Sequence, residues 1–271
     1  MSARPAFILL CALVLNACAP DAASTDREPR RIISLDFCAD QYLLAFADRD
    51  QIVALSPDAE KSFSYFRDRA HGIRQTPART EDILIQKPDA VIRTYGGGPN
   101  ITAFMERVGV DVIQIAYAND LAAIRQNVVD TAAALGASDR GAAIIADMDK
   151  RLADVNANAG GDILYMTSKG AVAGTDTLMD ELITRAGRTN FVQTAGWRMA
   201  PLEQLAYAAP DAVAAGFFDG SDARTDLWSA ARHPVARRAM RNSDVIDIPG
   251  DWTACSAWFV VDAVEAMAAA Q

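Results

Sequence analysis

Histidine is scarce in this chain of 271 residues, which has only His71 and His233. A site for bare zinc or manganese needs several histidines together with carboxylates. The sequence therefore disfavours a bare-metal binder and predicts no metal site. His233 directly precedes Pro234, in a context typical of a helix start, so we expect a structural role for it rather than that of a catalytic base.

The motifs of common enzyme classes are also missing. The glycines at 96–98 are not followed by Gly-Lys-Ser or Gly-Lys-Thr, so they do not form a Walker phosphate loop. The nucleophile motif Gly-x-Ser-x-Gly is absent. We find no set of nucleophile, base and orienting residue, so the sequence predicts no catalytic residue and no cofactor, and it disfavours an enzyme.

Basic residues are outnumbered in this chain. It has 26 Lys and Arg against 35 Asp and Glu, and its formal net charge is −9. Nucleic acids and anionic membrane surfaces attract basic proteins, so the sequence argues against both as partners. Because 51% of the residues are hydrophobic, we expect a packed globular protein.

Apolar runs long enough to cross a bilayer are missing, and the run near the N-terminus covers only residues 6–15. It follows Arg4, which is the pattern of an export signal. Residues 15–18, Leu-Asn-Ala-Cys, resemble a bacterial lipobox, in which Cys18 becomes the lipidated first residue. We expect residues 1–17 to be a lipoprotein signal peptide, and ordinary cleavage a few residues later remains the alternative.

Residues 18–30 are rich in Ala, Asp, Pro and Ser, and we expect them to form a flexible tether. Both ways of cleavage export the protein, so we expect a periplasmic product, anchored to a membrane if Cys18 is lipidated. Loss of Arg4 with residues 1–17 would change the side-chain charge from −9 to −10.

Cysteine is rare, and export of the chain decides which of its four cysteines could pair. Cys11 leaves with the signal peptide and a lipidated Cys18 cannot pair, which leaves Cys38 and Cys255 in an oxidising compartment. Each follows a predicted strand, near the start of a helix, and we expect one in each half of the chain. Three interpretations stay open: a disulfide between the halves, two thiols that contact a ligand or a soft metal, and two unrelated cysteines.

One phrase occurs twice in the chain. Residues 81–91 read Glu-Asp-Ile-Leu-Ile-Gln-Lys-Pro-Asp-Ala-Val, and residues 203–213 read Glu-Gln-Leu-Ala-Tyr-Ala-Ala-Pro-Asp-Ala-Val. Each copy predicts a helix ended by a proline and then a buried strand. Glu81 and Glu203 each fit a helix's first turn, where the dipole favours acids. As a repeated pair they indicate a partner surface with two matching basic sites.

Apolar strands alternate with helices along the chain, which is typical of a parallel sheet covered on both faces. A long helical run within residues 136–160 interrupts the alternation, which then restarts. We therefore predict an α/β protein with two Rossmann-like lobes, residues 31–135 and 161–271, joined by one linker helix. Because bending a helix breaks its hydrogen bonds, we expect little lobe motion.

Ligands of parallel α/β sheets bind at the edge where the carboxyl ends of the strands meet. This rule selects loops that are rich in aromatic residues, and an aromatic rim suits a large, partly apolar ligand. The alternative for each ring is that it caps the sheet edge as local core. The candidate ligand-binding residues are Phe37, Cys38, Tyr65, Tyr95, Trp197, Arg198, Trp252 and Cys255.

Four segments, taken in order, resemble the helical-backbone periplasmic binding proteins. They are Arg-Ile-Ile-Ser-Leu-Asp at 31–36, the phrase that begins at Glu81, Val-Gly-Val-Asp-Val-Ile at 108–113, and Gly-Trp-Arg-Met-Ala-Pro-Leu-Glu at 196–203. These proteins are the soluble receptors of ABC importers for ferric siderophores, haem and cobalamin. The resemblance covers essentially all of residues 31–271.

The resemblance implies a two-lobed monomer with a rigid linker helix and a shallow cleft for a metal chelate. It also implies one docking glutamate in each lobe, which pairs with arginines of a permease dimer in the inner membrane. Glu81 and Glu203 match those two positions. Such charge pairing orients docking and speeds the encounter more than it adds affinity.

The same resemblance offers a role to several cleft residues. Trp197 matches a place where the cobalamin-binding member puts a ring against its ligand. Haem binders use a Tyr or His ligand, for which Tyr95 is available. Siderophore binders use arginine and tyrosine against an anionic chelate, and Arg93, Arg198 and Tyr95 are available for this.

We therefore expect a substrate-binding lipoprotein of an ABC importer that captures a metal chelate between its lobes, with a ferric siderophore favoured. A cobalamin-type corrinoid and haem are the alternative ligands in the same fold. An exported α/β enzyme and a sensor or scaffold without a transport role are the rival classes.

Overall fold

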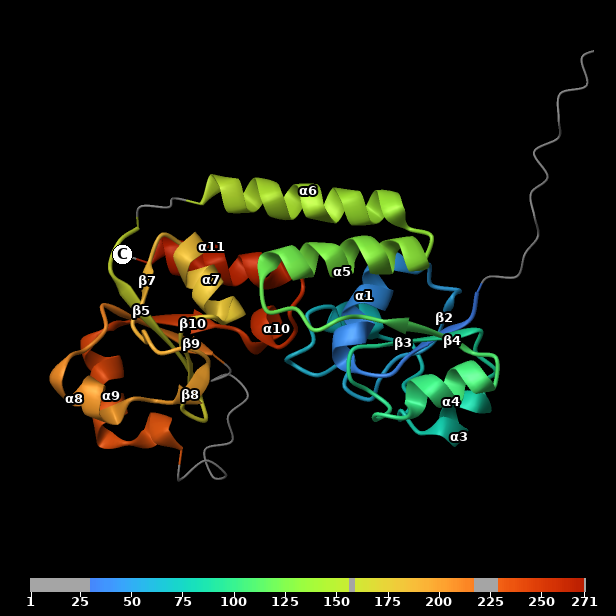
Figure 1. Ribbon diagram of the computed structural model, residues 1–271, viewed down its shortest axis with the longest axis horizontal. Coiled ribbons are helices and arrows are strands. Elements are labelled where there is room, and N and C mark those ends of the chain that lie inside the picture. The colour runs from blue at the N-terminus through green and yellow to red at the C-terminus, as the bar shows by residue number, and fades with distance from the viewer. Residues whose placement is uncertain (1–29, 156–158, 217–228, 271) are drawn as a thin grey trace, which may run out of the picture.

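The computed structural model describes residues 30–155, 159–216 and 229–270. The predicted signal peptide, Cys18 and nearly all of the predicted tether lie outside these residues. Two sheets lie side by side along the long axis of the molecule, and helices flank both (Figure 1). The predicted α/β fold with two lobes is therefore confirmed. Within the described ranges, no helix is both long and apolar enough to cross a bilayer.

The first lobe is built on a four-stranded parallel sheet of order β2-β1-β3-β4. Its strands are short and rich in Ile, Val and Ala, and those of the central pair are fully buried, as in a sheet covered on both faces. The elements are β1 (Ile32–Ser34), α1 (Phe37–Phe46), β2 (Ile52–Ala54), α2 (Arg67–Ala70), α3 (Thr80–Leu84), β3 (Ala90–Arg93), α4 (Ile101–Arg107), β4 (Asp111–Gln114) and α5 (Leu121–Ala134).

The second lobe is built on a sheet of order β10-β9-β5-β6-β8, with β7 paired to β5. Its elements are β5 (Asp162–Thr167), β6 (Ala171–Ala173), α7 (Leu178–Arg185), β7 (Thr189–Asn190), β8 (Trp197–Met199), α8 (Leu202–Tyr207), β9 (Ala212–Gly216), η1 (Ala230–Arg232), α9 (Pro234–Asn242), β10 (Asp244–Ile248), α10 (Gly250–Thr253), η2 (Trp258–Val260) and α11 (Val261–Ala269).

Strands β10, β9, β5 and β7 are parallel, whereas β6 and β8 extend the sheet in the antiparallel sense. The sequence did not predict β6, β7 or β8, because each has only two or three residues and glycines interrupt this region. The expectation that Trp197 and Arg198 lie in a loop is therefore wrong. Both residues belong to the edge strand β8.

The repeated phrase has the same structure in both lobes. Glu81 lies in the first turn of α3 and Glu203 in the first turn of α8. The Pro-Asp-Ala-Val of each copy then leads into β3 or β9. Each of these strands pairs in parallel with the first strand of its own lobe, β1 or β5.

The aspartate of the phrase makes an equivalent hydrogen bond in each lobe. The carboxylate of Asp89 accepts from the backbone N–H of Arg31 at 2.8 Å, and that of Asp211 accepts from the N–H of Asp162 at 2.9 Å. Both donors stand at the start of the neighbouring strand. The likeness of the two copies therefore extends to side-chain contacts.

The linker helix α6 (Ser138–Asp154) runs along the long axis of the molecule over both lobes (Figure 1). It lies close to α5, because a Cβ added at Gly141 would stand only 2.6 Å from the Cβ of Ala132. Near its carboxyl end, Arg151 holds it to the second lobe, because the Arg151 guanidinium pairs with the carboxylate of Asp262 in α11 at 2.5 Å. Of the predicted linker, residues 156–158 lie outside the described part.

The C-terminal segment crosses back to the first lobe. Cys255 and Phe259 are buried in the same cluster as Tyr42 of α1. The ring of Phe259 stacks on that of Tyr65, with centroids 4.1 Å apart. Cys255, which follows the last strand of the second lobe, is therefore part of the core of the first lobe.

The start of α5, a helix of the first lobe, packs in turn against the second lobe. Leu121 and Ile124 are fully buried in a cluster with Val260 and Val261 and with the core of the second lobe. The lobes thus share buried apolar surface in both directions, and opening them would expose it to water. This adds a second physical reason to expect little lobe motion.

Candidate ligand-binding cleft

Two adjoining cavities, of about 260 and 190 Å³, lie where residues of the two lobes meet. They share Tyr117 and Ser256 in their walls, so we treat them together as one cleft. The larger cavity reaches the carboxyl end of β5, the start of α7 and the strand β8. The smaller cavity reaches the carboxyl end of β3 and the first turn of α1.

Three aromatic side chains give the cleft its character. Tyr95, Tyr117 and Trp197 line it, and each is more than half exposed. The ring of Trp197 stands edge-on to the buried ring of Tyr165, with centroids 5.9 Å apart. Exposed rings held on a firm support provide apolar contact area for a large ligand at low entropic cost.

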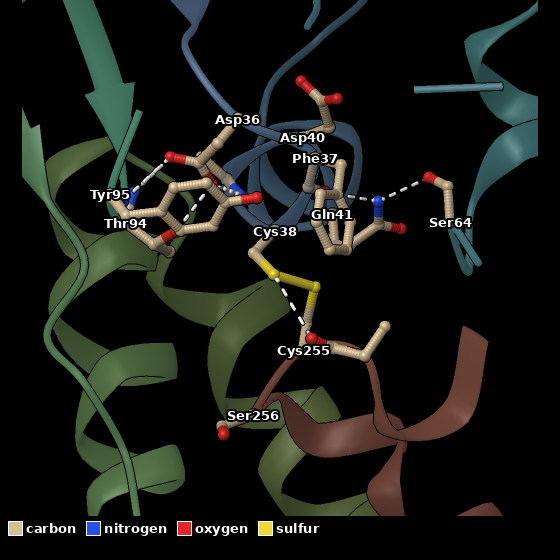
Figure 2. Close-up of a disulfide and its surroundings, with 12 residues drawn as sticks. Asp36, Phe37, Cys38, Asp40, Gln41, Ser64, Thr94, Tyr95, Cys255 and Ser256 are labelled. Atoms are coloured by element: carbon tan, nitrogen blue, oxygen red, sulfur yellow. Dashed lines mark hydrogen bonds between the residues drawn. A yellow bond between two sulfur atoms is a disulfide. The ribbon is translucent and has the colours of Figure 1, made fainter. Parts of the chain in front are cut away.

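The carboxylate of Asp36 holds the Tyr95 loop in place (Figure 2). It caps α1 by accepting the backbone N–H of Ala39 at 2.9 Å. It also accepts the backbone N–H groups of Thr94 at 2.8 Å, Tyr95 at 3.1 Å and Gly96 at 2.9 Å, and the Thr94 hydroxyl at 2.6 Å. A buried carboxylate with this many donors fixes the loop to the helix start.

The same loop requires glycine at position 96. A Cβ added at Gly96 would stand 2.2 Å from the carbonyl oxygen of Leu35, so no other residue fits. Arg93 is also committed to this loop: it donates to the Tyr95 carbonyl at 3.0 Å and to the Thr102 hydroxyl at 2.9 Å. The expectation that Arg93 is available to an anionic chelate is therefore wrong, because its side chain is buried.

The electrostatic surroundings keep the Tyr95 phenol protonated. Its partial burial, and then the negative charges of Asp36, Asp58 and Asp40, raise its pKa to about 12. At neutral pH, Tyr95 is therefore a hydrogen-bond donor and an apolar surface.

The two cysteines form a disulfide, which is one of the three interpretations that the sequence left open. Cys38 and Cys255 have Cα atoms 5.4 Å apart and join the first turn of α1 to the segment that follows α10 (Figure 2). The bond lines the smaller cavity. Because both sulfur atoms are used, two free thiols cannot hold a soft metal here.

Phe37 and Tyr65 are not among the residues that line the cleft. Phe37 packs edge-on against Phe63, with ring centroids 4.9 Å apart. It also packs edge-on against Tyr95, with ring centroids 6.3 Å apart. Tyr65 donates its hydroxyl hydrogen to Asp262 at 2.8 Å. Their rings therefore pack against other residues of the protein. This is the alternative that the sequence left open, in which a ring is part of the local core.

Arg198 and Trp252 are not among the lining residues either. Arg198 is exposed on β8 beside Trp197, and neighbouring residues of a strand point to opposite faces. Trp252 is partly buried and packs against the core of the second lobe. Of the eight predicted ligand-binding residues, the structure brings Cys38, Tyr95, Trp197 and Cys255 to the cleft.

Tyr117 lines both cavities, and it was not among the residues predicted from the sequence. It lies three residues beyond β4, at the carboxyl end of a parallel strand. The rule that selected Tyr95 would have found it. Thr177, the N-cap of α7, was missed because β6 separates it from the end of β5.

The lining of the cleft has little charge. Among the described residues that line the two cavities there is no Lys, Arg or His, and Asp176 is the one carboxylate. In the described part of the chain, no group of three or more His, Cys, Asp or Glu side chains is placed to hold a metal ion. This cleft fits a ligand that binds through apolar contact and hydrogen bonds.

The two glutamates of the repeat are placed away from the cleft. Helices α3 and α8 lie towards opposite ends of the long axis, on the side of the molecule away from α6 (Figure 1). Glu81 and Glu203 are both exposed. Among the ion pairs of the described residues, neither glutamate takes part. Their carboxylates are therefore available to a partner.

His233 has the structural role that the sequence suggested. It is the N-cap of α9, and its Nδ1 accepts the backbone N–H of Val235 at 3.3 Å. Pro234 occupies the first position of the helix, where its missing N–H costs nothing.

Comparison with known families agrees with this architecture. The sequence matches the family of periplasmic binding proteins over residues 32–251. The chain belongs to this family. The resemblance noted from the sequence is thereby confirmed. A comparison with curated protein sequences gives no match.

Solved structures of periplasmic binding proteins share the fold over 89% of this chain. The haem-binding protein RhuT from Roseiflexus sp. RS-1 is 21% identical and covered over 98% of its length, with a TM-score of 0.67. The vitamin B12-binding protein BtuF of Vibrio cholerae is 20% identical and 96% covered, with a TM-score of 0.61. An ABC transporter substrate-binding protein from Listeria monocytogenes EGD-e is 15% identical and 97% covered, with a TM-score of 0.65.

Proposed function

We propose that this chain is the substrate-binding component of an ABC importer and that it captures a metal chelate in the cleft. The observation that carries the proposal is the set of three exposed rings, Tyr95, Tyr117 and Trp197, in the cleft of a periplasmic binding protein. Solved relatives that bind haem or vitamin B12 support a large, ring-like or chelated ligand.

The described lining favours a ligand without net negative charge. An anionic chelate would lose its hydration in the cleft without gaining a cation from this lining, because none of the described residues that line the two cavities is basic. A ferric siderophore remains the first choice in a neutral form, such as a trihydroxamate in which three anions balance Fe³⁺. A corrinoid fits the same surface and is the second choice.

Haem is the third choice. Its propionates are anionic and meet no basic side chain among the described residues that line the cleft.

Delivery would use the two glutamates. Glu81 and Glu203 are exposed acids of the repeated phrase, in the first turns of α3 and α8, and both helices lie on the side of the molecule away from α6 (Figure 1). We expect them to pair with two arginines of a permease dimer. Changing both to alanine should abolish uptake of the ligand by cells but leave its affinity for the purified protein unchanged. A large loss of affinity would contradict the docking role.

The proposed location is the periplasm, with a lipid anchor at Cys18. The family supports an exported protein. Metabolic labelling with a radioactive fatty acid should mark the wild-type chain but not Cys18→Ser. Labelling of both proteins would place the lipid elsewhere.

Fluorescence titration tests the proposed ligand directly. Ferric trihydroxamate, cobalamin and haemin are added in turn to the purified chain, and saturable quenching of tryptophan emission is measured. We expect saturation by one of the first two ligands, and a weaker response in Trp197→Phe, because the ring near the ligand is altered. Absence of saturation with all three would contradict the chelate class.

An exported enzyme is the rival class, and the same complex distinguishes it. The ligand is released by denaturing the protein and its mass is compared with that of the added compound. An unchanged mass after prolonged incubation supports a binding protein, whereas a new product indicates catalysis.

A further inference from the structure

The carboxyl end of each proposed docking helix exposes one large apolar side chain, at the same position of the repeat. Tyr207 is the last residue of α8, and Ile85 is the C-cap residue of α3, with helical backbone angles and its N–H bonded to the Glu81 carbonyl. Ile85 is 81% exposed and Tyr207 is 93% exposed. Ile85 stands four residues after Glu81, and Tyr207 stands four residues after Glu203. Residues four apart on a helix lie on one face, so a carboxylate and an apolar group are neighbours in both lobes.

The coincidence is specific to this position of the repeat. Two residues earlier in each copy, Ile83 and Leu205 are buried in the cores of their lobes. Each helix therefore has an inner apolar side chain that holds it to the lobe and an outer one that no part of the chain covers. Outside the cleft, Ile85 and Tyr207 are the most exposed large hydrophobic residues of the described part.

An arginine also lies near the carboxyl end of each helix, but the two contacts are not equivalent in the repeat. Arg31 donates to the carbonyls of Gln86 at 2.8 Å and Lys87 at 3.1 Å, beyond the end of α3, whereas Arg238 donates to the carbonyl of Ala206 at 3.0 Å, inside α8. The equivalence of the two lobes therefore extends to the carboxylate and the apolar side chain.

We infer that Ile85 and Tyr207 are the apolar anchors of the permease interface, each inserting into a pocket beside the basic residue that pairs with Glu81 or Glu203. The inference rests on the proposed function and names the partner as a membrane protein with two similar docking sites. Two copies of one surface on a single chain match a two-fold symmetric partner, which presents the same site twice. Acidic groups attract the basic sites, and the apolar groups resist dissociation once water is excluded.

The test measures binding of the full chain to proteoliposomes that hold the permease and ATPase subunits encoded with it. Ile85→Ser with Tyr207→Ser should speed dissociation by about tenfold or more, with an unchanged dependence of association on salt. Glu81→Gln with Glu203→Gln should instead slow association and remove its dependence on salt.

Two matched variants control the experiment. Ile85→Leu with Tyr207→Phe keeps the apolar surface and should bind within about twofold of the wild type. Val129→Ser with Val245→Ser removes exposed apolar groups of α5 and β10 and should not change binding. Unchanged urea unfolding of all variants shows that folding is intact.

The outcomes separate this inference from the proposed function. If the serine variant dissociates like the wild type while the glutamine variant binds poorly, the apolar anchors are refuted and the docking glutamates stand. If neither variant differs from the wild type, the docking role of both helices is refuted. If the serine variant changes only the sedimentation of the free chain, Ile85 and Tyr207 contact a second copy of this chain instead.

Discussion

The carboxylate of Asp36 accepts a hydrogen bond from the backbone N–H of Tyr95 at 3.1 Å, across 59 residues of sequence. Asp36 also caps α1, which carries Cys38 in its first turn. One buried acid therefore fixes both the aromatic loop and the helix that holds the disulfide. This side chain thereby positions the part of the smaller cavity's wall that Cys38, Thr94 and Tyr95 form.

Asp36→Asn should weaken both the fold and ligand binding. One carboxylate oxygen becomes an NH₂ group that faces N–H donors, so at least one buried donor loses its acceptor, at a cost of about 2–4 kcal/mol in unfolding free energy. Urea unfolding measures this loss, and fluorescence titration with the ligand measures affinity. Asp50→Asn, at an exposed position, is the control. Equal stabilities of the two variants would contradict the role of Asp36.

Reduction of the Cys38–Cys255 bond should destabilise the protein by about 2–5 kcal/mol, because the bond closes a loop of 217 residues. Intact mass should show alkylation of these two thiols only after reduction. Labelling of either thiol in the oxidised protein would rule out the bond. Cys38→Ala with Cys255→Ala should reproduce the lower urea midpoint of the reduced protein.

Trp197→Ala and Arg198→Ala distinguish a neutral ligand from an anionic one. Loss of the Trp197 ring should weaken binding by about tenfold, since an aromatic contact in a cleft contributes on the order of 1–2 kcal/mol. Arg198→Ala should leave affinity unchanged, because Arg198 is not among the cleft-lining residues. Isothermal titration of both variants is the measurement. A tenfold loss in Arg198→Ala alone would indicate an anionic chelate.

Asp40 should make stability depend on pH. Burial is the main cause that raises its pKa from 3.8 to about 6, although Ser56 donates hydrogen bonds to it at 3.0 and 2.6 Å. Because the folded pKa lies above the unfolded one, its favourable contribution is complete below pH 3.8 and is lost as pH rises towards 6.

The measurable consequence is a difference between the wild type and Asp40→Asn. Relative to this variant, the wild type should lose roughly 3 kcal/mol of unfolding free energy between about pH 4 and pH 7. Urea unfolding across this range provides the comparison, in which the other carboxylates cancel. Parallel profiles for the two proteins would contradict the raised pKa.

Much of the fold could be predicted from local pattern. The repeated phrase indicated two equivalent helix–proline–strand units, and α3–β3 and α8–β9 have that form. Helix α5 has Asp120 as its N-cap, and the Asp120 carboxylate accepts the backbone N–H of Ala123. These features depend on periodicity, caps and prolines within a few residues, which a sequence shows directly.

The cleft could be predicted only in part. The strand-end rule selected Tyr95, which lines the cleft, but it also selected Tyr65, which stacks on Phe259 from the end of the chain. It offered Arg93 to the ligand, although the fold buries that guanidinium against the Tyr95 carbonyl. Whether a ring or a cation faces solvent depends on which distant segment covers it, and one sequence does not contain that information.

The sequence by itself determined the α/β class, the doubled acidic phrase and the two cysteines left for an oxidising compartment. Only the tertiary structure decided that Cys255 lies in the core of the first lobe and pairs with Cys38, and that Tyr95, Tyr117 and Trp197 share one cleft. The physical reason is how far apart in the sequence the interacting residues lie. Helices, strands and caps are fixed by neighbours along the chain, whereas burial and pairing are fixed by neighbours in space.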